Sequence, residues 1–340
     1  MTDVAIVGGG PAGAAAAIAC AKAGLSTVLL EQTVAALATE DEPEESLGPD
    51  SVAQLGALGI DCAQASWPYI GITTGSHVTL FAGRSPAPGR HVRRSWLDDA
   101  LRSSAIRAGA ECRRGVEAVG IESRDAGATL LTSDGALRTR YVIDATGRRC
   151  WLARRLELVR QWRSPSLIAW RRVASTGGQP ASLARFSPTD GGWSFVAPIS
   201  PDRTVVTELR LARRGIDSLP SGARPTVVTW HVVRQLAGPG WCIAGDAAAA
   251  IDPAAGIGIS FALRSGLAAA GAARACLSDR TAASVVAARY DEALLTEFTA
   301  AAEGLVARYR ELGIDELAGT GRSYSPSIAS SRSFTKPWRK

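Results

Sequence analysis

Apolar and polar positions near the N-terminus follow the pattern of a strand, a helix and a second strand. Residues 4–7 form an apolar run that predicts a buried strand, and the alanine-rich residues 11–23 predict a helix that ends at Gly24. A second apolar run over residues 26–30 predicts another strand. Strands that alternate with a helix are typical of a parallel sheet, so the pattern favours an α/β lobe.

Strand patterns dominate the middle of the chain. Residues 69–83 alternate β-branched and small side chains, as a strand pair or hairpin does, and residues 165–212 are strand-rich again. Between them, residues 96–108 predict a helix, and three short strand-like runs lead to residues 141–144. The middle of the chain therefore predicts a lobe built on β sheet.

The C-terminal third is mainly helical. Residues 241–244 predict a strand that leads into a Gly-Asp-Ala turn, and residues 260–276 predict a helix. Residues 285–312 predict either a helical pair or one long helix. The tail from Thr320 is rich in serine and basic residues, so we expect it to pack weakly.

Composition limits the class of protein. Of the 340 residues, 46% are hydrophobic and 21% are charged, which is ordinary for a soluble globular enzyme and excludes disorder along the whole chain. The apolar stretch 12–21 is too short to cross a membrane, and the N-terminus lacks the features of a signal peptide. Six scattered cysteines without a CxxC pair favour reduced thiols in the cytoplasm, and the three histidines form no metal-binding pattern.

Charge adds little about partners. The 38 basic residues exceed the 32 acidic residues by six, and only Lys22, Lys336 and Lys340 are lysines. No dense basic block marks a nucleic-acid surface, so we expect neither nucleic acid nor a membrane as a partner.

A glycine-rich turn lies between the first predicted strand and helix. Gly8, Gly10 and Gly13 fit the GxGxxG pattern, and Pro11 and Ala12 open the helix. In this arrangement the first glycine makes the tight turn, the second lets a pyrophosphate approach, and the third packs helix on strand. The N-terminus of the helix then faces the phosphates.

Glu31 stands at the end of the second predicted strand, 18 residues beyond Gly13. A carboxylate at this place accepts both hydroxyls of an adenosine ribose and repels a 2′-phosphate. Strand, turn, helix and acid together predict dinucleotide binding, although they do not choose between FAD and NAD.

A second motif makes that choice. Gly245 and Asp246 follow the strand predicted at residues 241–244, and a turn with Pro253, Gly256 and Gly258 comes shortly after. Here the sequence resembles the FAD-dependent monooxygenases and halogenases of the p-hydroxybenzoate hydroxylase type. The resemblance implies that Asp246, after Gly245, binds the ribityl chain of FAD and that the turn lies against the flavin ring.

The same turn has a chemical use of its own. A turn that opens a helix aims backbone N–H groups at negative charge developing on the flavin. We therefore predict Pro253, Gly256, Ile257 and Gly258 as catalytic residues. The alternative for Asp246 is a simple helix cap.

Three further segments resemble the same family, in the same order. Residues 45–60 match one of them. Arg94 begins the second, in which the arginine lies near the FAD pyrophosphate. Residues 144–148 match a D-A-T-G turn that packs along the cofactor. The resemblance thus implies that Arg94, Asp144 and Gly147 bind FAD.

Residues 192–198 bear on the type of reaction. They resemble the W-x-W-x-I-P stretch of flavin-dependent halogenases, although Phe195 stands in place of the second tryptophan. They equally resemble a stretch in halogenase-like hydroxylases, including those that mature tryptophan-derived quinone cofactors. Trp193 and Phe195 alternate on one strand face, so with Pro198 they either wall an aromatic substrate pocket or form core.

A missing lysine and a histidine bear on the chemistry. The resemblance implies that a halogenase would carry a lysine shortly after the segment 45–60, but the chain has no lysine between Lys22 and Lys336. This argues against halogenation of the tryptophan type. His77 lies in the predicted strand pair and is either a general base for a phenol or indole or a surface histidine.

We therefore predict an α/β fold with a Rossmann-like FAD-binding lobe of the p-hydroxybenzoate hydroxylase type, a β-sheet substrate lobe and C-terminal helices. The expected boundaries are 1–62, 90–163 and 235–278 for the FAD-binding lobe, 63–89 and 164–234 for the substrate lobe, 279–319 for the helices and 320–340 for the tail.

The resemblance implies an FAD-dependent monooxygenase that hydroxylates an electron-rich aromatic ring through a flavin C4a-hydroperoxide, with O2 as co-substrate. Indole or tryptophan is a candidate ring, either free, on a carrier or within a protein. NAD(P)H or a partner flavin reductase would supply the electrons. The alternatives are a flavin-dependent halogenase, a reductase or desaturase of the geranylgeranyl-reductase type, and a flavin-binding maturation factor without catalysis.

Overall fold

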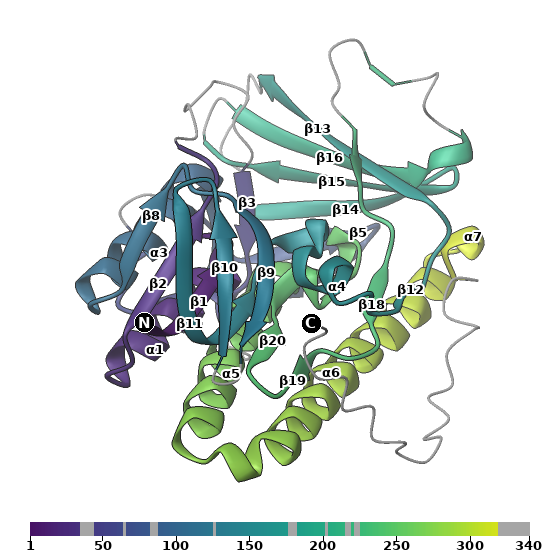
Figure 1. The fold of residues 1–340 in the computed structure, drawn as a ribbon. Coiled ribbons are helices and arrows are strands. Elements are labelled where there is room, and N and C mark those ends of the chain that lie inside the picture. The colour runs from purple at the N-terminus through teal and green to yellow at the C-terminus, as the bar shows by residue number, and fades with distance from the viewer. Residues whose placement is uncertain are drawn as a thin grey trace.

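A mostly parallel sheet forms the centre of the first lobe (Figure 1). The computed structural model describes residues 1–34, 44–63, 66–81, 88–124, 127–175, 182–200, 203–214, 219–220 and 225–318. Within these residues the sheet has eight strands, namely β1 Thr2–Val7, β2 Thr27–Glu31, β8 Glu111–Arg114, β9 Ala118–Arg124, β10 Gly127–Thr132, β11 Gly135–Asp144, β19 Ala237–Gly238 and β20 Trp241–Ile243.

The strand order of this sheet shows which of its edges is suited to bind a ligand. Its main path runs β19-β20-β11-β1-β2-β8, and β10 and β9 continue from β11. Strands β20, β11, β1, β2 and β8 run parallel. Their carboxyl ends therefore meet at one edge, which is where ligands bind in open α/β sheets.

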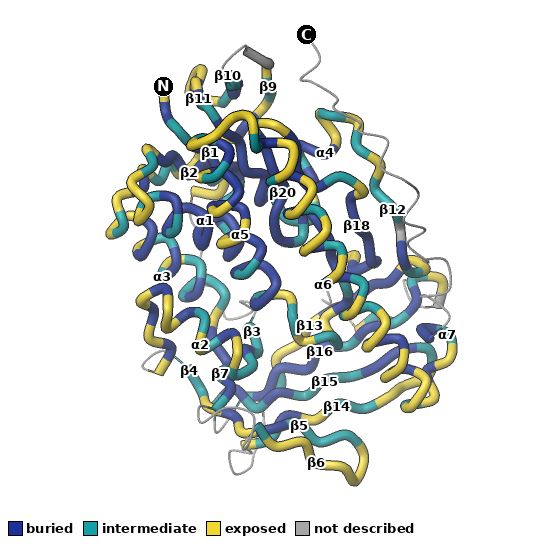
Figure 2. Tube along the Cα trace, turned by 90° about the horizontal axis from the view of Figure 1, so that it is seen from below, coloured by how far each residue is buried: buried dark blue, intermediate teal, exposed yellow. Residues whose placement is uncertain are grey.

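Three helices pack side by side on this lobe, with α1 in the middle (Figure 2). They are α1 Pro11–Lys22, α3 Arg94–Arg107 and α5 Gly258–Ser278. Most of α1 is alanine and is buried. A Cβ added at Gly266 of α5 would lie 2.1 Å from the backbone oxygen of Ala12, so the glycine permits a very close helix crossing. This crossing holds the start of α1, where the glycine-rich turn lies.

A second sheet forms the other lobe, shown at the top and right of Figure 1. Among the described residues it has seven strands in the order β17-β13-β16-β15-β14-β5-β6. They are β5 Gly71–Thr74, β6 His77–Leu80, β13 Leu167–Ser175, β14 Leu183–Thr189, β15 Gly192–Pro198, β16 Arg203–Leu211 and β17 Thr226–Val227. The antiparallel β5–β6 pair confirms the hairpin predicted within residues 69–83.

Two small sheets and three short helices accompany the two large sheets among the described residues. Two three-stranded sheets have the orders β3-β7-β4 and β12-β18-β21 within the described residues. Their strands are β3 Glu44–Leu47, β4 Ser66–Tyr69, β7 Gly89–Arg93, β12 Arg160–Trp162, β18 His231–Val233 and β21 Ala249–Ala250. The short helices are α2 Pro49–Ala57, α4 Trp151–Arg155 and α7 Asp315–Ala318.

Helix α6 (Ala283–Glu311) resolves the alternative left open by the sequence, because it is one helix of 29 residues. Its first half packs into the core of the first lobe through Tyr290, Leu294 and Phe298. Its second half packs into the core of the β-sheet lobe, where Leu305 and Tyr309 are buried. The helix therefore connects the two cores.

The lobe boundaries expected from the sequence remain a prediction. Strand β18 falls within the segment expected for the substrate lobe, yet Val232 and Val233 belong to the core of the first lobe. The predicted tail at 320–340 lies outside the described residues.

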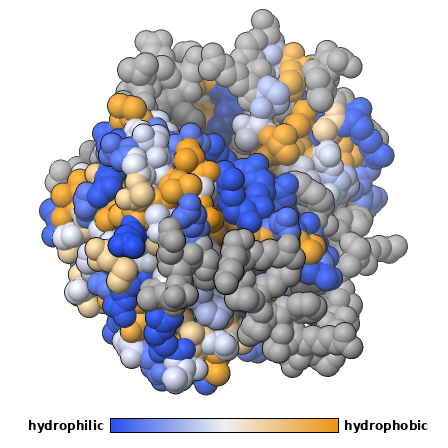
Figure 3. All heavy atoms as spheres, viewed as in Figure 1, coloured by the Kyte–Doolittle hydropathy of each residue, from blue (hydrophilic) through white to orange (hydrophobic). Residues whose placement is uncertain are grey.

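The described helices include none that is long and apolar enough to span a membrane. On the face shown in Figure 3, hydrophobic and hydrophilic residues are interspersed.

Because a half-buried carboxyl group lies on α6, we expect the stability of the fold to depend on pH. Asp291 Oδ1 accepts a hydrogen bond from the Leu236 backbone N–H at 2.9 Å. Burial raises the pKa of Asp291 from 3.8 to about 7, although hydrogen bonds from Leu236 and Ala237 oppose the shift. The folded state therefore keeps its proton to higher pH than the unfolded state. This contribution to stability is complete below pH 3.8 and is lost as the pH rises to about 7.

We expect Asp291→Asn to lose less stability than wild type as the pH rises. The amide is neutral at every pH and still offers an oxygen to the Leu236 N–H. The gain in unfolding free energy at pH 8 should be on the order of 1 kcal/mol, with almost no gain at pH 4. Thermal unfolding at both pH values measures it. Glu292→Gln, an exposed neighbour on α6, is the control and should show no such difference. Equal effects of Asp291→Asn at the two pH values would contradict the assignment.

Candidate functional site

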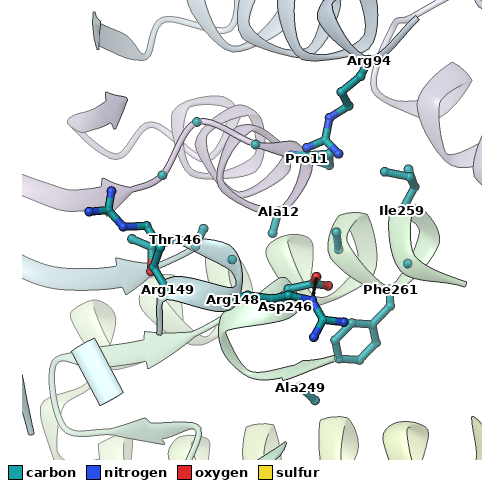
Figure 4. A pocket seen from close by; sticks show the side chains of 18 of the residues that line it. Pro11, Ala12, Arg94, Thr146, Arg148, Arg149, Asp246, Ala249, Ile259 and Phe261 are labelled. Carbon is teal, nitrogen blue, oxygen red and sulfur yellow. Dashed lines mark ion pairs between the residues drawn. The ribbon is translucent and has the colours of Figure 1, made fainter. Parts of the chain in front are cut away.

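A cavity of about 580 Å³ opens at the carboxyl ends of the parallel strands, as shown in Figure 4. It is lined by the glycine-rich turn after β1, the end of β2, the turn after β11 and the segment after β20. The predicted cofactor residues that line it are Gly8, Gly10, Pro11, Ala12, Glu31, Arg94, Gly147, Gly245, Asp246, Pro253, Gly256 and Gly258. The fold thus brings together segments that are far apart in sequence.

The glycine-rich turn owes its shape to its glycines. Gly8 has a φ of +107°, and a Cβ added there would lie 2.3 Å from the oxygen of Ala145. A Cβ at Gly13 would lie 1.9 Å from the oxygen of Gly8, so Gly13 packs the helix against the turn and does not itself line the cavity. A Cβ added at Gly10 would lie 3.7 Å from its nearest neighbour, Arg94 Nη2. The cavity therefore has room for a phosphate at the N-terminus of α1.

Glu31 is fixed at the end of β2 by two backbone donors. Its Oε2 accepts a hydrogen bond from Gly9 N at 2.8 Å, and its Oε1 accepts one from Thr33 N at 2.7 Å. Each carboxylate oxygen keeps a second lone pair, because an ionised carboxylate accepts about four hydrogen bonds. The side chain is therefore oriented by the chain and is still able to accept ribose hydroxyls.

Arg94 reaches the same cavity from the start of α3. Its Nε donates to both carboxylate oxygens of Asp98 at 3.0 Å, and its Nη1 donates to Glu45 Oε1 at 3.2 Å. Burial lowers the pKa of Arg94, but the two carboxylates outweigh burial and raise it above its ordinary value. Figure 4 shows the guanidinium pointing toward Pro11 at the glycine-rich turn. A fixed cation there suits a pyrophosphate.

Asp144 and Gly147 play different parts in the turn after β11. Asp144 is fully buried and lies outside the lining of the cavity. Its carboxylate accepts hydrogen bonds from Thr146 N at 2.9 Å and Leu152 N at 2.7 Å. These bonds hold the backbone of the turn in place. Gly147, with a φ of +61°, lies on the cavity surface.

Asp246 faces an arginine across the cavity. Figure 4 shows its carboxylate paired with Arg148, whose Nε lies 3.5 Å from Asp246 Oδ2. Arg148 also donates to the backbone oxygens of Thr229 at 2.8 Å and Ile251 at 3.3 Å. In the sequence, Arg148 directly follows the D-A-T-G motif, and the motif alone predicts no role for it. Its partners lie on distant segments, so no local pattern could have shown them.

We expect Asp246→Ala to lower FAD affinity about tenfold, because it removes one charged hydrogen-bond acceptor and leaves Arg148 without its carboxylate. The ratio of flavin to protein absorbance after saturation and desalting measures FAD occupancy. Asp246→Asn keeps an oxygen acceptor and should lose less. Full occupancy in Asp246→Ala would show that this carboxylate pairs with Arg148 without holding FAD.

The turn that follows Asp252 borders the cavity with open backbone. Pro253, Gly256, Ile257 and Gly258 all line it. Gly256 has a φ of +65°, and a Cβ at Gly256 or Gly258 would meet nothing within 4 Å. The turn therefore presents its backbone to the cavity with free space in front of it. An isoalloxazine ring fits such a surface.

A second cavity, of about 510 Å³, lies in the β-sheet lobe and shares Pro253 and Gly256 with the first. Its wall contains six aromatic side chains, which are Tyr69, Phe81, Phe186, Trp193, Phe195 and Tyr309. The sequence left Trp193 and Phe195 open between a substrate pocket and core. Trp193 does both, because it lines this cavity and is also only 1% exposed in the core of the lobe.

Two predicted residues lie away from both cavities. Pro198 does not line either of them, although its neighbours Ala197 and Ile199 line the second. His77 is exposed at the start of β6 and lines neither cavity. The structure therefore does not bring His77 to the predicted flavin turn.

The second cavity also contains residues that sequence reasoning missed. Arg171 of β13 lines both cavities, and its Nη2 lies 3.8 Å from Glu45 Oε2. Tyr309 of α6 also lines the second cavity, next to Trp193. A charged residue in an apolar strand was a usable signal for Arg171, whereas nothing marked Tyr309. Among the described residues no group of His, Cys, Asp or Glu is placed to hold a metal ion.

Two sequence comparisons find similarity between this chain and known proteins. A family model described as lycopene cyclase protein matches residues 3–162. A menaquinone reductase of Mycobacterium tuberculosis is 29% identical over 312 residues, which cover 78% of this chain and 74% of the reductase.

Two solved structures extend the likeness to nearly the whole chain. The flavin-dependent halogenase CmlS superposes with a TM-score of 0.81 at 19% identity, over 96% of this chain and 68% of CmlS. The peptidyl tryptophan dihydroxylase QhpG, described as essential for tryptophylquinone cofactor biogenesis, superposes with a TM-score of 0.70 at 20% identity, over 95% of this chain and 76% of QhpG. The chain therefore has the fold of the FAD-dependent monooxygenases and halogenases, as the sequence motifs predicted. The fold and the arrangement of the cavity are those of FAD-dependent oxidoreductases.

Proposed function

We propose that the protein is an FAD-dependent monooxygenase that hydroxylates an electron-rich aromatic ring. The observation that carries this proposal is the junction of the two cavities. The aromatic-walled cavity meets the cofactor cavity at Pro253 and Gly256, the turn against which a flavin ring would lie. A planar substrate held between aromatic walls would then present its edge to the flavin.

The residues present fit FAD and suggest what each would do. The N-terminus of α1 and Arg94 would bind the pyrophosphate, Glu31 the adenosine ribose, and Asp246 the ribityl chain. When bound, FAD supplies the redox chemistry and the activation of O2. The chain itself would orient the substrate ring, and the apolar wall around Trp193 and Phe195 would exclude water from the reacting atoms.

An indole or tryptophan is the substrate class that we favour. QhpG, which shares the fold, is described as a peptidyl tryptophan dihydroxylase. A tryptophan within a protein or on a carrier is therefore a substrate form to test beside the free amino acid. NAD(P)H or a partner flavin reductase would supply the electrons.

A reductase is the second candidate, favoured by the menaquinone reductase that matches most of this chain. An apolar cavity also accepts an isoprenoid chain, so its lining alone does not exclude this reaction. Halogenation is disfavoured, because no lysine is present between Lys22 and Lys336 to direct an oxidised halide.

The test uses FAD-loaded protein, chemically reduced flavin and a panel of indole, L-tryptophan and a tryptophan-containing peptide. A monooxygenase incorporates one oxygen atom from ¹⁸O₂ into a product, detected by mass spectrometry. A reductase instead adds two hydrogens to a menaquinone without O2. With sodium bromide or chloride added to the assay, bromine or chlorine bound in the product would identify a halogenase. Stable FAD binding with none of these products would favour the non-catalytic maturation factor.

A further inference from the structure

A buried hydrogen-bond chain connects the wall of the second cavity to the turn beside the cofactor cavity. Trp193 Nε1 donates to the Tyr309 hydroxyl at 3.0 Å. The Tyr309 hydroxyl lies 2.6 Å from Asp252 Oδ2. Asp252 Oδ2 also accepts a hydrogen bond from Trp230 Nε1 at 3.0 Å. All four side chains are 2% exposed or less, so water does not compete with these contacts.

The direction of every bond in this chain is fixed by its chemistry. An indole N–H is only a donor, so Trp193 must donate and the Tyr309 oxygen must accept. The proton of Tyr309 is then left to donate to Asp252. The Ala254 backbone N–H donates to the other carboxylate oxygen at 2.9 Å. With three donors among the described residues, Asp252 is satisfied as an ionised carboxylate.

Burial raises the pKa of Asp252 to about 6, and the hydrogen bonds from Tyr309, Ala254 and Trp230 oppose the shift. The carboxylate is therefore ionised at pH 8, in agreement with the direction of its hydrogen bonds. A buried charge held by three donors is costly to disturb, because each lost donor leaves part of that charge unpaired.

The two ends of this hydrogen-bond network lie at different cavities. Trp193 and Tyr309 line the aromatic-walled cavity, and Asp252 lines the cofactor cavity. Asp252 also caps the 3-10 turn Pro253–Ala255, the first part of the turn predicted to lie against the flavin. The second indole donor, Trp230, lines neither cavity. Only the Trp193 side of the network therefore connects the two cavities.

We propose that Tyr309 is a positioning residue that couples the wall of the aromatic cavity to the Pro253–Gly258 turn and, through it, to the flavin. This rests on the proposed FAD site but not on any particular substrate. Within the described residues, a change at Trp193 would reach Asp252 through the Tyr309 hydroxyl, which is hydrogen-bonded to both. Substrate that presses on Trp193 would act by the same route.

A double-mutant cycle on the midpoint potential of bound FAD tests the coupling without any substrate. Trp193→Phe removes the first donor, and Tyr309→Phe removes the hydroxyl while keeping the ring. We expect Trp193→Phe to shift the potential in the wild-type background. In the Tyr309→Phe background it should shift the potential by less than half as much, because the route is already broken.

Trp230→Phe provides the matched control, since it also removes one indole donor from the network. Because Trp230 donates to Asp252 directly and not through Tyr309, its shift should persist in the Tyr309→Phe background. Circular dichroism and the absorbance of bound FAD show that each variant is folded and loaded. Equal shifts from Trp193→Phe in both backgrounds, or none in either, would overturn the coupling. Failure of the unmodified protein to bind FAD would instead overturn the proposed function, so the two failures are distinguishable.

Discussion

Glu31→Arg should weaken FAD binding about 100-fold, because it removes a carboxylate expected to make two charged hydrogen bonds to the adenosine ribose. The loss has a second cause within the chain itself. Glu31 Oε2 accepts the hydrogen bond from Gly9 N, so the substitution also frees the middle of the glycine-rich turn. An arginine cannot accept that bond. Titration of apoprotein with FAD, followed by quenching of flavin fluorescence, measures the dissociation constant.

Two neighbouring variants separate the causes. Glu31→Gln keeps an oxygen for Gly9 and should lie between wild type and Glu31→Arg. Thr33→Arg introduces a guanidinium two residues further on, at an exposed position, and keeps both Glu31 and the backbone N–H that Thr33 donates to it. It should change affinity little. A dissociation constant for Glu31→Arg equal to that of wild type would show that the ribose lies elsewhere.

Many of the residues that line the first cavity could be predicted, because each belongs to a local sequence pattern. Gly8, Gly10 and Gly13 are spaced by the needs of one turn, and Glu31 marks the end of one strand. Backbone conformation at such positions admits few residue types, so the sequence pattern is informative. Asp144 shows the limit of this logic. Its place in the motif was predicted, but the structure buries it beneath the turn, where it caps Thr146 and Leu152.

The other half of the site could not be predicted, because it depends on contacts between distant segments. Tyr309 is 57 residues from Asp252, and nothing in a helix pattern distinguishes it from other buried positions. The sequence did not decide whether Trp193 lines a pocket or belongs to the core. Alternation shows which face of a strand is apolar, but it does not show what covers that face. His77 had a suitable chemistry, but the exposure of β6 became visible only once the strand was placed at the sheet edge.

Gly266→Ala should destabilise the fold by about 3 kcal/mol, the upper end of the usual cost of overpacking a core. A Cβ there would lie 2.1 Å from the oxygen and 3.0 Å from the carbonyl carbon of Ala12. These are backbone atoms, so no side chain can rotate away and the helices α1 and α5 must separate. Separation would also displace the start of α1, and FAD affinity should fall with stability. Thermal unfolding of the apoprotein and FAD titration of the folded variant measure the two effects.

Gly271→Ala on the same helix supplies the matched control. Gly271 is exposed, and a Cβ there would meet nothing within 4 Å. Alanine is a better helix former than glycine, so this variant should gain about 0.5–1 kcal/mol in stability and bind FAD as wild type does. The opposite signs at two positions of one helix distinguish steric separation of α1 and α5 from a general effect of helix propensity. If Gly266→Ala were as stable as Gly271→Ala, the close crossing would not hold the glycine-rich turn in place.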